Sequence, residues 1–217
     1  MLRIVKAGFL TILLSFLVAG YAFAEEAPTR ILIISDLQIT DDESSCGRFA
    51  DALADMAMQD PYPDAIVING DLTNDGQEEE WELYRSTLSD SGISIPIFAT
   101  NGNHDIGRGE DAKPDDVYTQ ERDLFFQYTD FCGTGDDQLE YMDFSVAVNG
   151  YHVIALGNGN GNWHQEYTET QLQWFEDELL RCTREDAGKP VLVLTHEGIP
   201  NTVSGTLSED SGQDWEF

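Results

Sequence analysis

Residues 95–105 read Ile95-Pro96-Ile97-Phe98-Ala99-Thr100-Asn101-Gly102-Asn103-His104-Asp105, an apolar run that passes directly into a cluster of polar side chains. The apolar part predicts a buried β-strand. Ligands of open α/β sheets bind beyond the carboxyl ends of the strands. Asparagine and histidine can coordinate a metal, and histidine and aspartate can transfer protons. Taken alone, however, the cluster is equally typical of a polar turn.

Three further apolar runs end in the same way, each with a side chain that can bind a metal. One apolar run that ends in a polar side chain needs no functional explanation. Four such runs indicate that these side chains converge at one edge of the fold. The three endings are Asp36 after residues 31–35, Asp71 after residues 65–70, and His196 after residues 191–195.

The composition indicates one globular domain with a very acidic surface. The chain has 217 residues, of which 41 are Asp or Glu and 11 are Lys or Arg, and its formal net charge is -30. Binding of duplex nucleic acid is not expected, because it depends on cations that displace counterions. An acidic protein also repels anionic substrates unless bound metal cations reverse the local field. The charge alone would suit a surface-binding or calcium-binding protein, but no Asp-x-Asp-x-Asp-Gly loop supports that alternative.

Residues 1–24 have the pattern of a secretory signal peptide. Arg3 and Lys6 precede an uncharged, largely apolar run that ends in the small-x-small sequence Ala22-Phe23-Ala24. We therefore expect cleavage after Ala24, which leaves residues 25–217 as one domain exported to the periplasm or secreted, with no stable membrane span. An uncleaved membrane anchor is the alternative, because the uncharged run approaches spanning length.

Export would permit disulfide bonds. The chain has three cysteines, so at most one internal pair can form, and the sequence does not identify it. We expect one disulfide and one unreactive thiol among Cys46, Cys132 and Cys182.

The predicted elements alternate between strands and helices before a change of pattern. The alternation predicts a parallel sheet with right-handed crossovers. Its first strand is apolar throughout, which predicts burial on both faces. Asn149-Gly150 between two strand-like runs then predicts a β-hairpin that opens a second sheet. The expected strands are 30–35, 65–69, 93–100, 141–148, 151–156 and 191–195; the expected helices are 48–59, 77–88, 121–128 and 169–181; the expected loops or turns include 36–47, 106–119 and 133–137.

The candidate residues suit a site with two metal ions. Asp36 and Asp71 suit hard cations, and Asn103 and His196 add neutral ligands, a set consistent with Mn, Fe or Zn. Two such ions polarise phosphate oxygens and lower the pKa of a bound water. His104 would then stabilise the transition state or protonate the leaving oxygen, and we expect the next residue, Asp105, to fix its tautomer by accepting the other ring proton.

The order of these motifs resembles the calcineurin-like metallophosphoesterase superfamily. Its pattern is Asp-x-His, Gly-Asp, Gly-Asn-His-Asp/Glu, His and Gly-His-x-His, and the resemblance covers roughly residues 31–200. It implies an α/β fold of two mixed β-sheets in a sandwich flanked by helices, and metal-dependent hydrolysis of a phosphomonoester or phosphodiester. By this resemblance Asp36 binds the first metal, Asp71 bridges, Asn103 and His196 bind the second, and His104 is the catalytic acid or transition-state stabiliser.

Two departures from the family pattern affect these expectations. Gln38 stands where the pattern has histidine, so the first metal site is expected to be weaker or differently selective. No Gly-His-x-His follows His196, so we expect this chain to be the N-terminal part of the family domain; the alternative is a degenerate domain that binds metal or ligand without catalysis. His164 is a conceivable substitute ligand, although a polar loop residue or substrate contact is the simpler interpretation. His152 is expected to be packed or exposed within a strand.

Overall fold

The fold is a sandwich of two three-stranded sheets, seen in a computed structural model that describes residues 28–106, 115–133, 135–158 and 167–198. The first sheet is parallel and has the order β1-β2-β3; the second has the order β4-β5-β6, with β4 antiparallel and β6 parallel to β5. The strands are β1 (Ile31–Ile34), β2 (Ala65–Asn69), β3 (Ile97–Thr100), β4 (Phe144–Val148), β5 (Tyr151–Leu156) and β6 (Val191–Thr195). The predicted α/β sandwich is therefore confirmed, including the hairpin at Asn149-Gly150.

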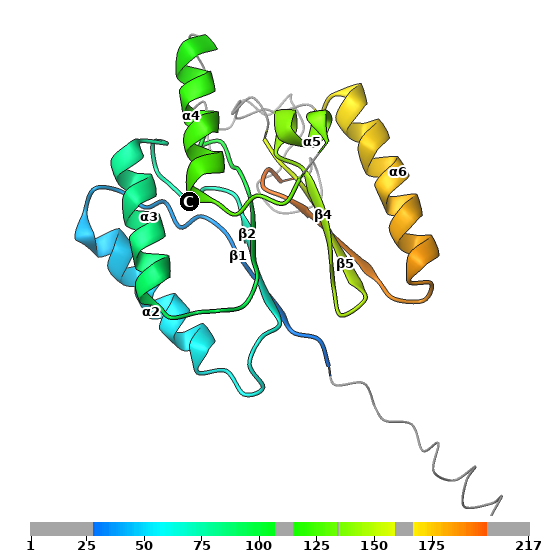
Figure 1. The fold of residues 1–217 in the computed structure, drawn as a ribbon, viewed down its shortest axis with the longest axis horizontal. Coiled ribbons are helices and arrows are strands. Elements are labelled where there is room, and N and C mark those ends of the chain that lie inside the picture. The colour runs from blue at the N-terminus through cyan, green and yellow to red at the C-terminus, as the bar shows by residue number, and fades with distance from the viewer. Residues whose placement is uncertain (1–27, 107–114, 134, 159–166, 199–217) are drawn as a thin grey trace, which may run out of the picture.

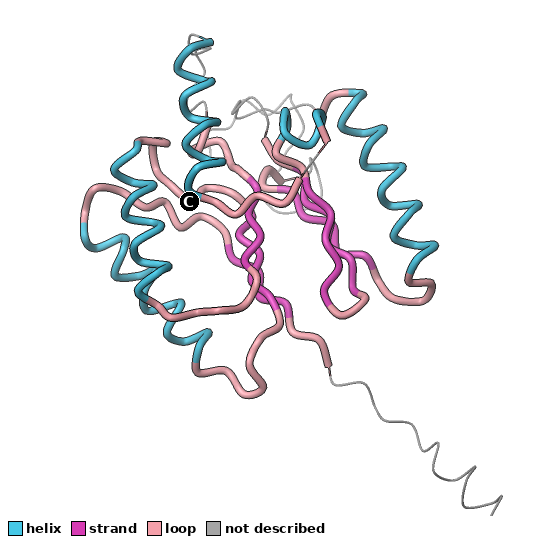
Figure 2. The backbone as a smooth tube through the Cα atoms, in the orientation of Figure 1, coloured by secondary structure: helices cyan, strands magenta, loops and turns pink. Residues whose placement is uncertain are grey.

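Helices cover the outer faces of the sandwich. In Figures 1 and 2, α2 and α3 lie outside the first sheet, α6 lies outside the second, and α4 projects above the body of the molecule. The helices are α2 (Glu43–Ala57), α3 (Glu78–Asp90), α4 (Asp115–Tyr128), α5 (Asp136–Tyr141) and α6 (Glu169–Glu185). Among the described residues, none of these helices combines the length and apolar character needed to cross a membrane.

Helix boundaries differ from the predicted ones, and a local cap accounts for the start of α2. The carboxylate of Asp42 accepts a hydrogen bond from the Ser44 amide at 3.0 Å, so α2 begins within the stretch predicted as an acidic loop. Such a cap satisfies an amide that the first helical turn leaves unpaired. The predicted helix at 121–128 also begins earlier, at Asp115, and α5 replaces part of the predicted turn at 133–137.

Burial follows the position of each strand in its sheet. Val67 of the central strand β2 packs between the sheets with Phe144 and Val153, while Ile66 and Ile68 face the helices. The expectation that the first strand is buried on both faces is wrong, because β1 lies at the edge of the described sheet and Ile33 is 46% exposed.

The expected disulfide is not formed, and Cys46, Cys132 and Cys182 are free thiols. Cys46 belongs to α2, outside the first sheet, and Cys182 belongs to α6, outside the second. The sandwich therefore separates these two thiols. Burial raises the pKa of the Cys132 thiol to about 11, which keeps it protonated at neutral pH.

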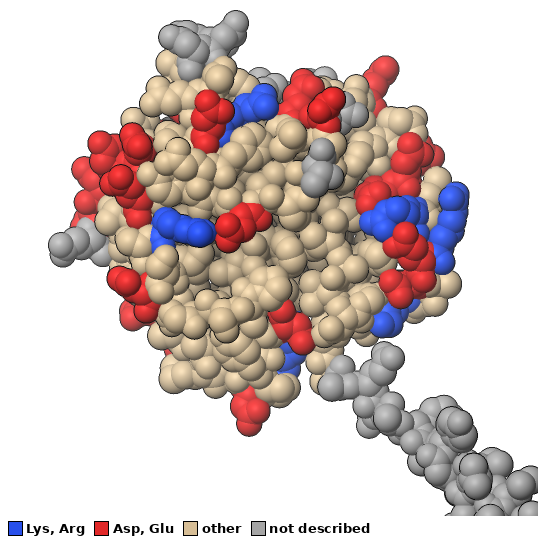
Figure 3. Space-filling model, in the orientation of Figure 1, with Lys and Arg blue, Asp and Glu red and all other residues tan. Residues whose placement is uncertain are grey.

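The charged side chains reflect the acidic composition. On the face shown in Figure 3, Asp and Glu lie mainly around the outline, and the fewer Lys and Arg side chains lie close to acidic ones. Arg181, for example, pairs with Glu178 and Glu185 on α6. The centre of this face is made mostly of uncharged residues.

Candidate metal centre

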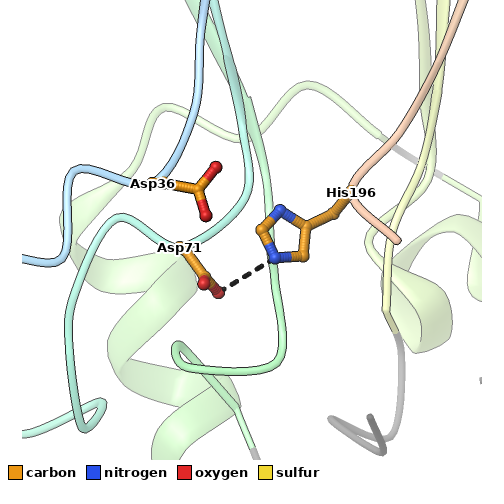
Figure 4. A group of neighbouring side chains, drawn as sticks. All are labelled: Asp36, Asp71 and His196. Carbon is orange, nitrogen blue, oxygen red and sulfur yellow. Dashed lines mark ion pairs between the residues drawn. The ribbon is translucent and has the colours of Figure 1, made fainter. Parts of the chain in front are cut away.

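Three of the predicted metal ligands meet where the strands end. Asp36 follows β1, Asp71 follows β2, and His196 follows β6 of the other sheet. One ligand atom from each lies within 4.8 Å of the other two. Figure 4 shows the two carboxylates on one side and the imidazole approaching from the opposite sheet. The site is therefore assembled from both halves of the sandwich.

The two amide side chains predicted as ligands lie beside this group. The Oδ1 atom of Asn103 is 3.3 Å from Nε2 of His196, and Nε2 of Gln38 is 3.5 Å from Oδ2 of Asp71. Both amides therefore border the carboxylate–imidazole group, Asn103 on its His196 side and Gln38 on its Asp71 side.

The loops that carry the acidic residues have an unusual backbone conformation. Asp36, Gln38 and Asp71 have φ values of 57°, 43° and 55°, in the left-handed region that residues other than glycine seldom adopt. Backbone hydrogen bonds join these loops, among them those from the Asp36 amide to Gly70 O at 3.2 Å and from the Gln38 amide to Asp71 O at 2.9 Å. Backbone strain of this kind is concentrated at functional sites and persists only where the surroundings hold it.

Two glycines provide the space between the ligands. A Cβ atom on Gly102 would lie 2.2 Å from Oδ1 of Asp71 and 2.7 Å from Nε2 of His196. A Cβ atom on Gly70, which has a φ of +83°, would lie 2.5 Å from Nδ1 of His196. The Gly-Asp and Gly-Asn-His-Asp motifs therefore need glycine because the ligand atoms converge on the positions that a side chain would fill.

The hydrogen bonds of His196 set which ring nitrogen faces the other ligands. Its Nδ1 lies 2.8 Å from the backbone oxygen of Asn69, which can only accept a hydrogen bond. Nδ1 therefore carries hydrogen, and Nε2, 3.2 Å from Oδ1 of Asp71, has the free electron pair when the ring is neutral. This is the arrangement of a histidine ligand held by a carbonyl group.

Asp71 and His196 perturb each other's pKa. Burial acts to lower the pKa of His196, but the hydrogen bond and charge of Asp71 outweigh it and raise the pKa to about 9. Burial acts to raise the pKa of Asp71, and the His196 ring and the His104 amide outweigh it and lower the value. The metal-free site therefore holds an imidazolium–carboxylate pair near neutral pH.

Metal binding must displace the His196 proton, so we expect affinity for Mn²⁺ to rise with pH up to about 9. The ion pair of Asp71 and His196 also contributes to the stability of the metal-free protein. This contribution is fully present below the ordinary histidine pKa of about 6.5 and is lost as pH rises through about 9. Titration calorimetry in buffers of different ionisation enthalpy measures the released protons. A Mn²⁺ affinity that does not change with pH, without proton release, would contradict the expectation. The control is His152→Gln, which removes a histidine away from the site and should leave the pH dependence unchanged.

His104 is held by the neighbouring strand-end loops. Its amide donates to Oδ1 of Asp71 at 2.9 Å, and its Nδ1 lies 2.7 Å from the backbone oxygen of Asn74. Its Nε2 is 4.0 Å from Oδ2 of Asp71, so this nitrogen lies on the side of the candidate ligands. The ring is thus oriented with Nδ1 occupied and Nε2 toward the centre.

The predicted contact between Asp105 and the His104 ring is wrong. The Asp105 carboxylate is fully buried and accepts hydrogen bonds from the amide and hydroxyl of Thr73, at 2.8 and 2.9 Å, and from the Gly102 amide at 2.9 Å. Burial, with the charge of Asp71 adding to it, raises the pKa of Asp105 to about 7. Asp105 therefore joins the loops after β2 and β3, and the carbonyl of Asn74 orients His104 instead.

Sequence reasoning missed the asparagines that support the site. Asn69 contacts the Thr195–His196 segment, Asn74 orients His104, and the buried Asn101 donates to Asn158 O at 2.6 Å. The only available signal was their nearness to the motifs, since asparagine is also common in turns. Of the other two histidines, His152 is buried and pairs with Asp186 at 2.8 Å, away from this group, and His164 lies outside the described residues.

The arrangement fits a divalent metal. Two carboxylates, an imidazole with Nε2 directed inward and an adjacent amide form a donor set suited to Mn, Fe or Zn once the ring loses its Nε2 proton. Gly102 has no side chain that would compete with Asp71 and His196 for the space in which their ligand atoms converge.

Comparison with known proteins gives consistent matches. Residues 29–217 match the family model described as calcineurin-like phosphoesterase. A probable cyclic nucleotide phosphodiesterase of Pseudoalteromonas sp. (strain SM9913) is 32% identical over 204 residues, covering 86% of this chain and 63% of that protein. A probable glycerophosphodiester phosphodiesterase of Arcobacter nitrofigilis is 26% identical over 136 residues, covering 63% of this chain and 42% of that protein. The chain thus spans 42% and 63% of the length of these relatives.

A solved structure supports the fold. A purple acid phosphatase from yellow lupin (Lupinus luteus) seeds matches with a TM-score of 0.50 and 16% sequence identity, covering 73% of this chain and 28% of that chain. At this identity the likeness concerns the fold alone, and it agrees with the two helix-flanked sheets described above.

Proposed function

Because this chain belongs to the calcineurin-like phosphoesterase family, we propose that it hydrolyses a phosphoester with metal ions held at the strand ends. The observation that carries the proposal is the convergence of Asp36, Asp71 and His196 within 4.8 Å, beside Asn103. Carboxylate, imidazole and amide groups together bind metals without fully neutralising their charge, so that the centre still attracts a phosphate group.

The residues divide into two ligand sets around Asp71. We propose that Asp36 and Gln38 hold one ion, that Asn103 and His196 hold a second, and that Asp71 bridges them. Bound divalent ions supply Lewis acidity toward phosphate oxygens and lower the pKa of water. Asp71 suits the bridging role because its two oxygens face different partners, Oδ1 toward His196 and Oδ2 toward Gln38.

We propose that His104 donates a proton from Nε2 to the leaving oxygen. The Asn74 carbonyl holds the hydrogen of Nδ1, so the ring presents Nε2 to the centre without reorientation. The His104 backbone amide, which bonds to Asp71, would remain in any side-chain variant.

His104→Ala is expected to retain metal binding and to lower turnover by roughly 10² to 10⁴. Steady-state kinetics with a phosphodiester, together with metal analysis of the same preparation, makes the measurement. Unchanged turnover would refute the assignment of His104 as the acid. A variant that loses its metal would instead show that the ring is needed for assembly of the centre.

We propose a phosphodiester as the substrate class, since both sequence relatives carry phosphodiesterase names. Hydrolysis of bis(p-nitrophenyl) phosphate and of p-nitrophenyl phosphate with Mn²⁺ tests the choice. Faster hydrolysis of the diester supports it, and hydrolysis of the monoester alone contradicts it. Retained metal without hydrolysis of either compound would favour the alternative, a degenerate domain that binds without catalysis.

We further propose export of the protein, on the basis of the signal-peptide pattern in residues 1–24. Mass spectrometry of the protein isolated from its producing cell tests this. A mature N-terminus at Glu25 is expected, and a chain that retains Met1 to Ala24 would refute cleavage.

A further inference from the structure

Asn69, the last residue of β2, contacts the second sheet through two different groups. Its side-chain Nδ2 donates to the backbone oxygen of Thr195 at 2.9 Å. Its own backbone oxygen accepts from Nδ1 of His196 at 2.8 Å. One hydrogen bond therefore holds the backbone carbonyl at the end of β6, and the other holds the imidazole of the next residue, His196.

These contacts matter because no strand ladder joins β2 to β6. The two strands belong to different sheets, so the position of one relative to the other depends on packing and on side-chain bonds. Asp36 and Asp71 come from the first sheet and His196 from the second. A small displacement between the sheets at this end would therefore move the imidazole away from the carboxylates.

The local packing alone does not favour an asparagine. The Oδ1 atom of Asn69 is buried and has no hydrogen-bond partner within the described part of the chain. A buried carbonyl oxygen without a partner is disfavoured relative to an apolar group of similar shape. The amide group therefore has a cost in the fold, and its nitrogen donates to the Thr195 carbonyl.

We propose that Asn69 is a positioning residue that sets the place of the His196 imidazole across the sandwich. Its carboxamide fixes the Thr195–His196 peptide, which keeps the ring within reach of the Asn69 carbonyl and directs Nε2 toward Asp71 and Asn103. The inference rests on the proposed function, because it takes His196 as a metal ligand.

The chain offers a matched control at the other end of the sandwich. Nδ2 of Asn149, in the β4–β5 hairpin, donates to Oδ1 of Asp64, just before β2, at 3.0 Å. This is also a hydrogen bond from an asparagine between the two halves, but it is remote from the strand ends that carry the ligands. Asn149 has a φ of 51°, so Asn149→Gly removes the amide while preserving the backbone conformation.

The test compares Co²⁺ binding to the wild-type chain, Asn69→Leu and Asn149→Gly. Asn69→Leu is expected to weaken the affinity by about 10- to 100-fold and to alter the visible Co²⁺ spectrum, because support of a ligating histidine typically has this effect. Asn149→Gly is expected to keep the wild-type affinity and spectrum. Thermal unfolding of the metal-free proteins shows whether the two variants lose similar stability.

Each outcome separates the inference from the proposed function. Wild-type affinity in Asn69→Leu, or an equal loss in Asn149→Gly, would overturn the positioning role. A wild-type chain that binds no Co²⁺ would overturn the proposed metal centre instead. If leucine prevents folding, Asn69→Ala removes the same donor without added bulk. Nitrogen NMR of the unmutated chain gives a further check, since hydrogen on Nε2 rather than Nδ1 of neutral His196 would contradict the arrangement.

Discussion

Asp71→Asn is expected to abolish both metal retention and phosphoester hydrolysis. The substitution preserves the shape of the side chain but removes the charge of a carboxylate that converges with Asp36 and His196. A neutral amide cannot bridge two cations as a carboxylate does. It also removes the partner that raises the pKa of His196, whose ring would then no longer form a charged pair in the metal-free protein.

Metal analysis after loading with Mn²⁺ and desalting measures this effect. The proposed centre predicts about two ions per wild-type chain and none in the variant. Asp130→Asn is the control, because the Asp130 side chain is 81% exposed and, within the described part of the chain, forms a surface pair with Arg85 at 3.4 Å. Such pairs contribute at most about 1 kcal/mol. Retention of the wild-type metal content in Asp71→Asn would refute the bridging role.

Gly102→Ala is expected to disable the site as completely as loss of a ligand. The added methyl group would lie 2.2 Å from Oδ1 of Asp71, 2.6 Å from the Asp71 amide nitrogen and 2.7 Å from Nε2 of His196. The amide belongs to the backbone and cannot rotate away. Moving the carboxylate would break its 2.9 Å bond from the His104 amide. We therefore expect loss of metal binding and of hydrolysis, with a less stable but folded protein.

Gly47→Ala in α2 is the matched control for this substitution. Apart from its chain neighbours and the backbone of its own helix, no described atom lies within 4 Å of the Cβ position at Gly47, and alanine is favoured over glycine inside a helix by about 1 kcal/mol. The control should therefore bind metal normally and unfold at the same or a higher temperature. Normal Mn²⁺ affinity in Gly102→Ala would show that the strand-end loops yield to the methyl group and that the close approach of the ligands is not essential.

The local features of this protein could be predicted from its sequence. The apolar runs ending at Asp36, Asp71, Asn103 and His196 indicated strands whose ends carry chemistry, and Asn149-Gly150 indicated the hairpin. These patterns are local, because the periodicity of a strand and the geometry of a tight turn depend on neighbouring residues. The start of α2 was predicted too late, at Arg48, although Asp42 is a favoured cap and places it at Glu43.

The contacts between loops could not be predicted in the same way. Asp105 follows His104 directly, which suggested a pair, yet the fold turns its carboxylate toward Thr73 and Gly102 and supplies the Asn74 carbonyl to the ring. Thr73 and Asn74 belong to the loop after β2, and Gly102 contributes its backbone amide. A backbone carbonyl has no signature in a sequence, because every residue has one.

The sequence by itself therefore determined the strands, the order of the motifs and the types of ligand, all of which depend on residues close together in the chain. The tertiary structure alone decided that β6 joins the second sheet, that Asn69 connects the first sheet to His196, and that the edge strand β1 leaves Ile33 exposed. The physical reason is that these features depend on the register and separation of two sheets, which packing across the sandwich sets and no single segment encodes.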